Sequence, residues 1–265
     1  MAEKPVILIT GASSGIGAAT ALYFGKRGYR VALAARRLDR LREVALEICN
    51  SGGEASAIEA DVSSSAQVQG LVERTLENYG RIDVLFNNAG FGRMRWLQNL
   101  DLEADIETQL QVNLLGTIRT VKAVLPTMIA QQSGHIINMS SVSGYIATPT
   151  YSIYAATKFG LRGFTDALRR EMIQHNVQVS GIYPGPVKTE FIEHMGSERK
   201  SGFKTPTWVV LTSEDVARAV WKLNQHPRRA VVLPGMFSWI IVLEQWFPAL
   251  VDWGIERFFI RRERR

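Results

Sequence analysis

Thr10-Gly11-Ala12-Ser13-Ser14-Gly15-Ile16-Gly17 connects a short apolar run, Val6–Thr10, to an amphipathic pattern that extends to about Arg27. The apolar run is typical of a buried strand, and the pattern after it predicts a helix. Glycine in such a turn lets a pyrophosphate approach the backbone, and the N-terminus of the helix offers free N–H groups to the anion. A glycine-rich turn alone is only a tight connection. With a strand before it and a helix after it, the turn predicts a dinucleotide-binding βαβ unit.

The rest of the chain continues the alternation of apolar runs and helical patterns. The predicted strands are Val6–Thr10, Arg30–Ala35, Ala55–Glu59, Val84–Phe86, His135–Met139, Val177–Ile182 and Ala230–Leu233. Helices are predicted at about 38–51, 65–79, 102–130 and 152–175, and after a cap at Thr212 or Ser213, with a break or an end near Pro126. Apolar strands separated by amphipathic helices predict a seven-stranded parallel sheet covered on both faces, a doubly wound, Rossmann-like α/β fold.

The chain divides into a long alternating part and a different C-terminal part. Residues 1–233 are expected to form one dinucleotide-binding catalytic domain, because no linker interrupts the alternation. Within it, residues 193–207 are rich in Ser, Gly, Lys and Pro, which predicts a loop or lid. Residues 234–265 are dense in apolar side chains and end in Arg261-Arg262-Glu263-Arg264-Arg265, so we expect an apolar and basic C-terminal extension.

The composition narrows the classes of protein that fit. Hydrophobic residues make up 46% and charged residues 21%, the balance of an ordinary globular protein. The net charge of +6 suits a phosphate-bearing cofactor, anionic lipid or nucleic acid and does not choose among them. Cys49 is the only cysteine, which excludes an intramolecular disulfide, and no signal-like segment precedes the first strand, so a cytoplasmic protein is expected. The four histidines lack metal-ligand spacing and basic residues are not interleaved with aromatics, so neither a metal site nor a nucleic-acid partner is expected.

The end of the second predicted strand reads Ala34-Ala35-Arg36-Arg37. A site for NAD usually has a carboxylate here that accepts hydrogen bonds from the ribose hydroxyls. A guanidinium instead can bind a 2′-phosphate through two parallel hydrogen bonds, and a carboxylate would repel that phosphate. The residues therefore favour NADP(H), with Ser13 as a further hydroxyl contact, over the simpler interpretation that these arginines form a solvated helix start.

Tyr154-Ala155-Ala156-Thr157-Lys158 places a phenol and an ammonium on one face of a predicted helix. A free tyrosine has a pKa of about 10, too high for ready proton exchange near neutrality. A nearby lysine and the positive nicotinamide of an oxidised cofactor are expected to lower that pKa, so that Tyr154 can give a proton to a substrate oxygen or take one from it. Such a pair also occurs by chance on helix surfaces, so its surroundings must support this interpretation.

Several segments in the right order together resemble the classical short-chain dehydrogenase/reductase (SDR) family, to about Leu233. These are the Gly-x-x-x-Gly-x-Gly spacing of the first turn, Asp61-Val62 after the third strand, Asn87-Asn88-Ala89-Gly90 after the fourth, Tyr154-x-x-x-Lys158, and Pro184-Gly185-Pro186-Val187-Lys188-Thr189 after the sixth. The resemblance implies a catalytic serine thirteen residues before the tyrosine, a position that Ser141 occupies. It implies that Asn113 kinks its helix and holds a water in a proton relay to Lys158. Asn113, Ser141, Tyr154 and Lys158 are then the catalytic tetrad, with the Ser141 hydroxyl steadying the developing alkoxide.

The resemblance also implies a set of cofactor contacts. Ala35 falls on the family's acidic position and Arg36 directly follows it, with Arg37 as a weaker candidate. The expected cofactor-binding residues are Gly11, Ser13, Ser14, Gly15, Ile16, Gly17, Arg36, Arg37, Asp61, Val62, Asn88, Ala89, Gly90, Tyr154, Lys158, Pro184, Gly185, Val187 and Thr189.

The residues expected near the substrate are mostly apolar. They are Phe91, Met94, Trp96, Val142, Tyr145, Ile146, Phe191 and Met195. Each could be core, but their location beside the catalytic loops favours pocket walls for several of them. An apolar pocket favours a small hydrophobic carbonyl or alcohol, such as a steroid-, retinoid- or lipid-like compound, although Arg93 and Arg95 leave charged recognition open. The function predicted is NADP(H)-dependent hydride transfer between the nicotinamide and a carbonyl or alcohol. The alternatives are a non-catalytic nucleotide-binding regulatory member of the same fold and, with less support, an epimerase or dehydratase.

The C-terminal segment admits two kinds of partner. Charged residues and prolines interrupt its apolar run, which is too short for a membrane span of roughly 20 residues. An amphipathic segment with three tryptophans and a basic end can lie peripherally on a membrane surface. The same side chains can instead form the interface of a homodimer or homotetramer, because either arrangement hides an exposed apolar patch.

Overall fold

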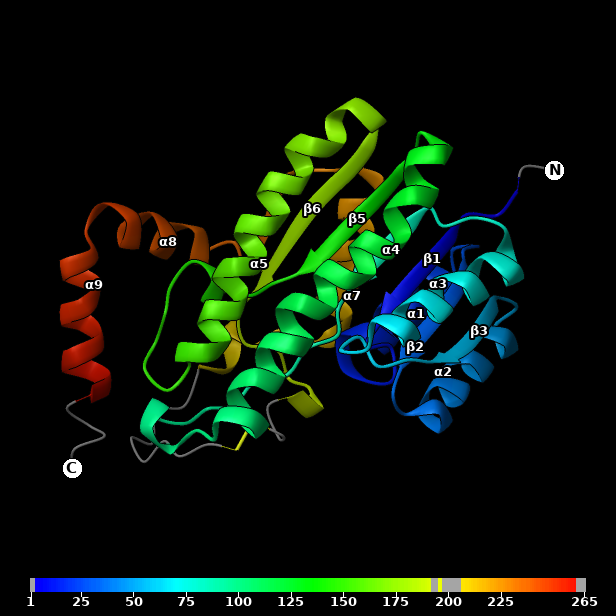
Figure 1. Ribbon diagram of the computed structural model, residues 1–265. Helices are drawn as coiled ribbons and strands as arrows, with labels where there is room; N and C mark the ends of the chain where they lie inside the picture. The colour runs from blue at the N-terminus through cyan, green and yellow to red at the C-terminus, as the bar shows by residue number, and fades with distance from the viewer. Residues whose placement is uncertain (1–2, 192–194, 197–205, 261–265) are drawn as a thin grey trace.

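The computed structural model describes residues 3–191, 195–196 and 206–260 and contains one seven-stranded parallel sheet (Figure 1). The spatial order of the strands is β3-β2-β1-β4-β5-β6-β7. Their bounds are β1 Val6–Thr10, β2 Arg30–Ala35, β3 Glu54–Glu59, β4 Val84–Asn87, β5 Gly134–Met139, β6 Val177–Pro184 and β7 Ala230–Leu233. The order reverses direction between β1 and β4, so the carboxyl ends of these two strands face a crevice, where open α/β sheets bind ligands. The predicted doubly wound fold is confirmed.

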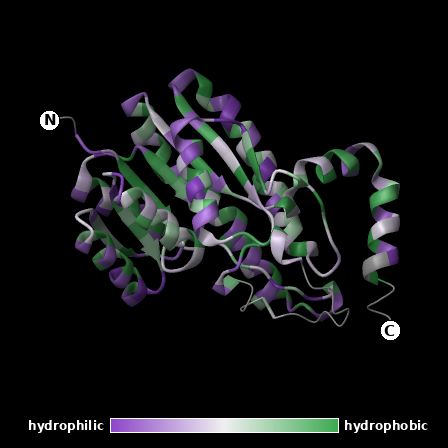
Figure 2. Cartoon of the chain, turned by 180° about the vertical axis from the view of Figure 1, so that it is seen from behind, coloured by the Kyte–Doolittle hydropathy of each residue, from purple (hydrophilic) through white to green (hydrophobic). Residues whose placement is uncertain are grey.

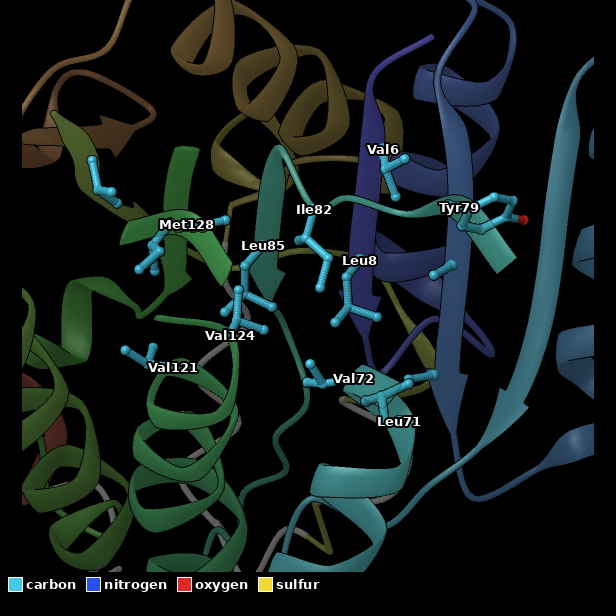
Figure 3. Close-up of a cluster of buried hydrophobic side chains, with 14 of the residues drawn as sticks. Val6, Leu8, Leu71, Val72, Tyr79, Ile82, Leu85, Val121, Val124 and Met128 are labelled. Carbon is cyan, nitrogen blue, oxygen red and sulfur yellow. The ribbon is translucent and has the colours of Figure 1, made fainter. Parts of the chain in front are cut away.

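Helices cover both faces of the sheet, as the apolar strands require. One face carries α3 Ser65–Tyr79, α4 Gly116–Gln131 and α5 Ser152–Glu171, and the other carries α1 Gly15–Gly25, α2 Leu38–Asn50 and α7 Ser213–Gln225. Side chains of β1 and β4 alternate between the two layers: Leu8 and Leu85 pack with Val72 of α3 and Val124 of α4 (Figure 3), whereas Ile7 and Phe86 pack on the opposite side. The sheet therefore separates two hydrophobic cores, and packing on both faces holds its strands in place.

A chain of buried polar side chains fixes the carboxyl ends of the central strands. Asn87 at the end of β4 donates to Asn138 of β5 (2.9 Å) and accepts from Thr120 of α4 (2.7 Å). Asn138 donates in turn to Thr165 of α5 (2.9 Å). Each of these four buried side chains has a hydrogen-bond partner. The network therefore aligns two strands and two helices without leaving any of the four unpaired.

The region before α4 differs from the single helix predicted over 102–130. Two π-helical stretches, Leu102–Glu107 and Leu110–Leu115, precede α4, and Pro126 lies inside α4 instead of ending it. Pro126 is exposed, as is Lys122, whose carbonyl loses its helical partner, so this carbonyl can be solvated. Packing of Val121, Val124 and Met128 against the sheet outweighs the lost hydrogen bond. The predicted break at Pro126 was therefore wrong, and the irregularity lies earlier in the segment.

Other predicted boundaries differ by only a few residues. The helix after β5 continues from α5 into a 3-10 turn, Met172–His175, as far as predicted. Thr212 caps α7 in a reciprocal capping box with Asp215, which selects Thr212 over Ser213 as the cap. The predicted lid, 193–207, falls largely outside the described residues.

After β7 the chain forms two short helices, α8 Phe237–Trp246 and α9 Pro248–Ile255, followed by a π-helical turn, Glu256–Ile260. Both views place α8 and α9 at one side of the body, and Figure 2 shows hydrophobic residues on both helices. Ile241 is buried, whereas Trp239 and Trp246 are 78% and 74% exposed. In the described part of the chain, no helix combines the length and the apolarity needed to cross a bilayer.

Candidate active site

The glycine-rich turn packs directly against the loop that follows β4. Gly11 has a positive φ of 65°, and a Cβ atom there would lie 2.8 Å from the Cα of Ala89. A side chain at Gly17 would overlap the carbonyl oxygen of Gly11. The amide of Asn88 donates to the carbonyls of Thr10 (3.2 Å) and Gly11 (3.0 Å), so it ties the turn to the β4 loop. The structure thus brings together the two segments that the sequence assigned to the cofactor.

The segment after β6 closes the other side of this crevice. A Cβ atom on Gly15, whose φ is +54°, would lie 3.3 Å from the methyl group of Thr189. Pro184 ends β6, and its carbonyl accepts a hydrogen bond from the hydroxyl of Ser141 (3.4 Å). Gly185 donates to Leu233 of β7, and Val187 is buried beside Leu211. The predicted contacts from Pro184 to Thr189 therefore connect the cofactor end of the crevice to the serine.

The two arginines after β2 take different positions. Arg37 reaches over the glycine-rich turn and donates to the hydroxyls of Ser13 (3.2 Å) and Ser14 (2.8 Å). Arg36 is exposed and lines a surface hollow together with Arg37, Leu38, Asp39, Arg40, Glu43 and Glu59. Of the two, it is Arg37, the weaker sequence candidate, that contacts the predicted phosphate-binding turn.

Asp61, Val62 and Ile16 support the crevice. The carboxylate of Asp61 accepts from the backbone N–H (2.8 Å) and hydroxyl (2.7 Å) of Ser63, which orders the start of α3. Val62 is buried against Gly116, where an added Cβ would lie 2.7 Å from the valine methyl group. Ile16 packs at the edge of the core beneath the turn.

Ser141, Tyr154 and Lys158 meet at the carboxyl end of β5. The β5 loop approaches α5 closely, since a Cβ at Gly144 would lie 2.8 Å from the carbonyl oxygen of Lys158. The ammonium of Lys158 is buried, donates to the carbonyl of Met139 (3.0 Å) and lies 5.5 Å from the centre of the Tyr154 ring. Ser141 accepts from the N–H of Ser143 (3.1 Å), which orients its hydroxyl at the start of a short 3-10 turn, Val142–Gly144.

Burial dominates the acid–base properties of the pair. It raises the pKa of Tyr154 above the usual value for tyrosine, while a hydrogen bond with Ser141 acts in the opposite direction. Burial also lowers the pKa of Lys158 to about 8, because desolvation disfavours the ammonium. The expectation that Lys158 lowers the pKa of Tyr154 is thus not met in the protein alone. The ammonium is held by a backbone carbonyl, and Ser141 is the group that favours the phenolate.

Asn113 holds the β4 loop against this centre. It is fully buried within the second π-helical stretch, accepts from the N–H of Phe91 (2.9 Å) and donates to the carbonyl of the same residue (2.7 Å). A Cβ on Gly90 would lie 3.1 Å from the Asn113 oxygen and 3.8 Å from the Lys158 nitrogen. Gly90 therefore lies between the two side chains, and Asn113 positions the loop through both backbone groups of Phe91.

Apolar and aromatic side chains surround Tyr154. The ring of Phe191 lies 5.8 Å from that of Tyr154 and the ring of Tyr151 lies 5.6 Å away. A Cβ on Gly92 would lie 3.3 Å from both Phe191 and Tyr154 and 3.6 Å from the sulfur of Met195. Phe191 and Met195, proposed from the sequence, are thus beside the tyrosine, and Tyr151 is an additional wall that the sequence analysis missed.

Some residues expected near the substrate have other partners. Tyr145 packs edge-on against Tyr183 at 4.8 Å, with the guanidinium of Arg162 4.0 Å above its ring. Arg93 and Arg95 both pair with the carboxylate of Asp105, at 2.9 and 3.8 Å. The sequence did not single out Asp105, because its role as their counter-ion depends on contacts with two residues that follow β4. An anionic substrate that bound either arginine would therefore compete with the carboxylate of Asp105.

Among the described residues, no group of three or more His, Cys, Asp or Glu side chains is placed to hold a metal ion.

Comparison with known proteins agrees with this arrangement. The family model for the short chain dehydrogenases matches residues 5–200. An uncharacterized oxidoreductase of Listeria innocua is 42% identical over 193 residues, which cover 72% of this chain and 77% of that protein. A 3-oxoacyl-[acyl-carrier-protein] reductase of Synechocystis is 39% identical over 234 residues, 88% of this chain and 94% of that protein.

Solved structures give the same result. An alcohol dehydrogenase from the archaeon Thermococcus sibiricus, complexed with 5-hydroxy-NADP, superposes with a TM-score of 0.78 at 32% identity and covers 87% of this chain and 96% of that one. A short chain dehydrogenase/reductase from Burkholderia phymatum, in complex with NAD, gives a TM-score of 0.84 at 25% identity, with 94% and 95% covered. The fold, the site and these matches agree, and the chain belongs to the short-chain dehydrogenase family.

Proposed function

We propose that the protein is an NADP(H)-dependent oxidoreductase that transfers hydride between the nicotinamide and a carbonyl or alcohol. The observation that carries the proposal is the convergence of Ser141, Tyr154 and Lys158 at the end of β5, beside the crevice formed by the glycine-rich turn. The names of the relatives support the same chemistry, since a 3-oxoacyl reductase acts on a carbonyl and an alcohol dehydrogenase on a hydroxyl.

The residues present fit a dinucleotide. Side chains at Gly11 and Gly17 would overlap the neighbouring backbone, so only glycine allows the turn to pack this closely. The turn opens α1, whose first N–H groups are available to a pyrophosphate, and Arg37 lies above it with Ser13 and Ser14. Next to the turn lie Thr189, beside Gly15, and Asn88, bonded to Gly11. Lys158 lies next to Tyr154 at the other end of the crevice. When bound, the cofactor supplies or accepts the hydride.

The chain's own residues supply the proton and hold the substrate oxygen. The Ser141 hydroxyl donates a hydrogen bond to the oxygen that becomes an alkoxide, in place of its long bond to Pro184. Tyr154 gives its phenolic proton to that oxygen in reduction and removes it in oxidation. Ser141 favours the phenolate that results, and the buried ammonium of Lys158, 5.5 Å from the centre of the Tyr154 ring, adds a positive charge that water screens little.

Preference for NADP(H) rests on the residues that follow β2. Ala35 leaves no carboxylate to repel a 2′-phosphate, and Arg36, Arg37 and Arg40 line one hollow beside the turn. Three acids, Asp39, Glu43 and Glu59, lie in the same hollow, and Glu43 and Asp39 pair with Arg40 and Arg42. Arg37, which contacts the turn, and Arg36 beside it are then the guanidinium groups that can bind the phosphate by two hydrogen bonds.

A hydrophobic substrate fits the walls of the site. Phe191, Tyr151 and Met195 lie beside Tyr154, and the nearby arginines, Arg93 and Arg95, pair with Asp105. Apolar walls around one polar centre favour a carbonyl compound with a large apolar part. Purified protein with NADPH and a series of ketones of increasing hydrophobicity tests this: kcat/KM should rise along the series. Equal rates with small polar ketones would contradict the proposed substrate class.

The alternative, a non-catalytic nucleotide-binding member of the family, has no support from the site. A regulatory protein would need only the turn and its arginines, whereas here a buried lysine and a buried tyrosine lie together at the end of the crevice. Burying two titratable groups costs free energy that nucleotide binding alone does not require. This arrangement favours catalysis.

We also propose that the C-terminal surface binds an anionic membrane surface. This surface consists of exposed side chains on and beside α8 and α9, namely Met236, Trp239, Val242, Leu243, Trp246, Phe247, Leu250 and Trp253. The sequence continues into a segment with five arginines and two acids between Glu256 and Arg265. Tryptophan prefers the interface of a bilayer, and arginine is attracted to anionic headgroups. The same surface could bind a second copy of the chain, and the test described below separates the two.

A further inference from the structure

Glu190 makes a contact that neither the cofactor motif nor the catalytic residues account for. It follows Thr189 in the segment after β6, and its carboxylate oxygen lies 3.2 Å from two nitrogens of Arg37, 153 residues away in the sequence. The same guanidinium donates to Ser13 and Ser14 of the glycine-rich turn. One arginine therefore links three segments that border the crevice: the turn, the end of β2 and the segment after β6.

The Glu190 carboxylate is ionised in this position. Its hydrogen bond with Arg37 holds its pKa below the usual range for glutamate, and a further hydrogen bond with Ser14 acts in the same direction. A carboxylate and a phosphate both accept charge-assisted hydrogen bonds from a guanidinium. Here both terminal nitrogens of Arg37 converge on one carboxylate oxygen of Glu190, so the carboxylate occupies the donors that a phosphate bound to Arg37 would need.

We propose that Glu190 is an internal competitor for Arg37, which the 2′-phosphate of NADP(H) must displace. This inference rests on the proposed preference for NADP(H). It adds Glu190 as a residue that limits how strongly NADP(H) is preferred over NAD(H). Glu190 reduces the affinity for NADP(H) and has little effect on the affinity for NAD(H), which has no 2′-phosphate. The preference of the wild-type protein is accordingly smaller than its arginines alone would give.

The ion pair is suited to this role because it is weak enough to exchange. The side chains of Arg37 and Glu190 are 48% and 42% exposed, and a surface ion pair of this kind is screened by water and salt. Removing the carboxylate should therefore tighten NADPH binding by only about two- to fivefold. A larger effect would require a buried pair, which this is not.

Glu190 also lies between two residues that border the site. Thr189 contacts the glycine-rich turn at Gly15, and the ring of Phe191 lies 5.8 Å from that of Tyr154. The contact with Arg37 thus holds a short segment that touches both ends of the crevice.

Dissociation constants of NADPH and NADH, measured for the wild type, Glu190→Gln and Glu47→Gln, test the inference. Glu47 is the matched control: it is an exposed glutamate of α2 that does not line the hollow, so its substitution removes the same charge without freeing Arg37 or Arg40. Glu190→Gln should lower the NADPH constant about two- to fivefold and change the ratio of the NADH to the NADPH constant by the same factor. Glu47→Gln should leave that ratio nearly unchanged.

The results that overturn the inference are equally distinct. A ratio that Glu190→Gln does not change, or weaker NADPH binding in that variant, would show that Glu190 does not compete for Arg37. The same shift in Glu47→Gln would attribute the effect to total charge alone. A wild-type ratio near one would instead contradict the proposed NADP(H) preference itself, so the two failures can be told apart.

Discussion

Arg36 and Arg37 are adjacent in sequence, yet the structure gives them different surroundings. Arg37 contacts Ser13 and Ser14 of the glycine-rich turn, whereas Arg36 is exposed in the hollow beside it. The side chain that contacts the turn could not be identified from the sequence, because both residues follow the last residue of β2 and both are long and flexible. The missing carboxylate at Ala35, in contrast, is visible in the sequence and needs no structure.

Replacing Ala35 by Asp and Arg36 by Ala together should move the cofactor preference toward NADH. The new carboxylate repels a 2′-phosphate and accepts from ribose hydroxyls, and one guanidinium is lost. We expect the ratio of kcat/KM for NADPH to that for NADH to fall about tenfold or more, since a hydrogen bond to a charged group contributes about 1.5–3 kcal/mol. Steady-state kinetics with both cofactors measures it. Equal efficiency of the two cofactors in the unmodified protein would contradict the argument.

Lys158 should give the reaction a pH dependence. Burial lowers the pKa of Lys158 to about 8, so the ammonium is present below that pH and is lost as the pH rises through it. In the proposed mechanism the buried ammonium assists the formation of the Tyr154 phenolate, so kcat/KM for NADPH in carbonyl reduction should fall above about pH 8. The parameter kcat/KM reports the free enzyme, to which this pKa applies. A profile that stays flat to about pH 10 would show that Lys158 does not titrate where its burial places it.

At the scale of elements, the strands were the most predictable part of the molecule. β1, β2 and β4 each contain a continuous apolar run, and the five central strands lie between two helical layers that require such runs. The irregular helix before α4 was less predictable. Asn113 stood out as a polar residue in an apolar stretch, but its bonds to the backbone of Phe91 depend on a loop 22 residues away. The break predicted at Pro126 was wrong because a proline on the exposed face of a helix can be accommodated. Which face is exposed is decided by packing, which the sequence does not show.

His135 on β5 should make the stability of the fold depend on pH. Burial lowers the pKa of His135 from 6.5 to about 4, and its ring nitrogens lie 2.8 Å from Ser180 and 3.3 Å from Asn224. The unfolded chain therefore binds a proton at higher pH than the folded chain does. Stability is complete above about pH 6.5 and falls as the pH drops toward 4.

Urea unfolding at pH 7 and pH 5 checks this prediction. The wild type should lose roughly 2 kcal/mol more of its free energy of unfolding between these values than His135→Gln, which has no titrating ring. The substitution itself will lower stability at pH 7, so the comparison is between the two slopes. Parallel pH dependence in the two proteins would exclude His135 as the cause.

At the scale of the whole molecule, the catalytic part and the C-terminal surface differ in what the sequence could predict. The sheet, the crevice and the positions of Ser141, Tyr154 and Lys158 follow from motifs whose positions are fixed by strand ends. The sequence of the C-terminal segment predicted exposed apolar residues without their arrangement. The structure divides the segment into α8 and α9 with a break at Phe247-Pro248. The ring of Phe237 packs against Gly185, so α8 begins beside the segment that borders the cofactor crevice.

Vesicle sedimentation tests the proposed membrane surface. The wild type should sediment with anionic vesicles at low salt and less with zwitterionic ones, because both apolar burial and arginine contribute. Replacing Trp239, Trp246 and Trp253 by Ser should abolish sedimentation. Trp208→Ser is the control, since Trp208 is 72% exposed but lies outside the C-terminal surface.

A second copy of the chain would give a different result. The wild type would then stay in the supernatant with every vesicle and form a dimer or tetramer in sedimentation velocity, and the triple variant would be monomeric. That outcome would reject the membrane and assign the C-terminal surface to self-association.

The most direct test of the proposed chemistry is the turnover of Tyr154→Phe, measured with NADPH and the ketone that the wild type reduces fastest. The substitution removes only the oxygen that exchanges the proton, from a side chain that packs between Phe191 and Tyr151. We predict that kcat falls by a factor on the order of 100 or more, while the dissociation constant for NADPH stays within about threefold of the wild-type value. Turnover within a few-fold of the wild type, in a variant that still binds NADPH, would contradict the assignment of Tyr154 as the proton donor.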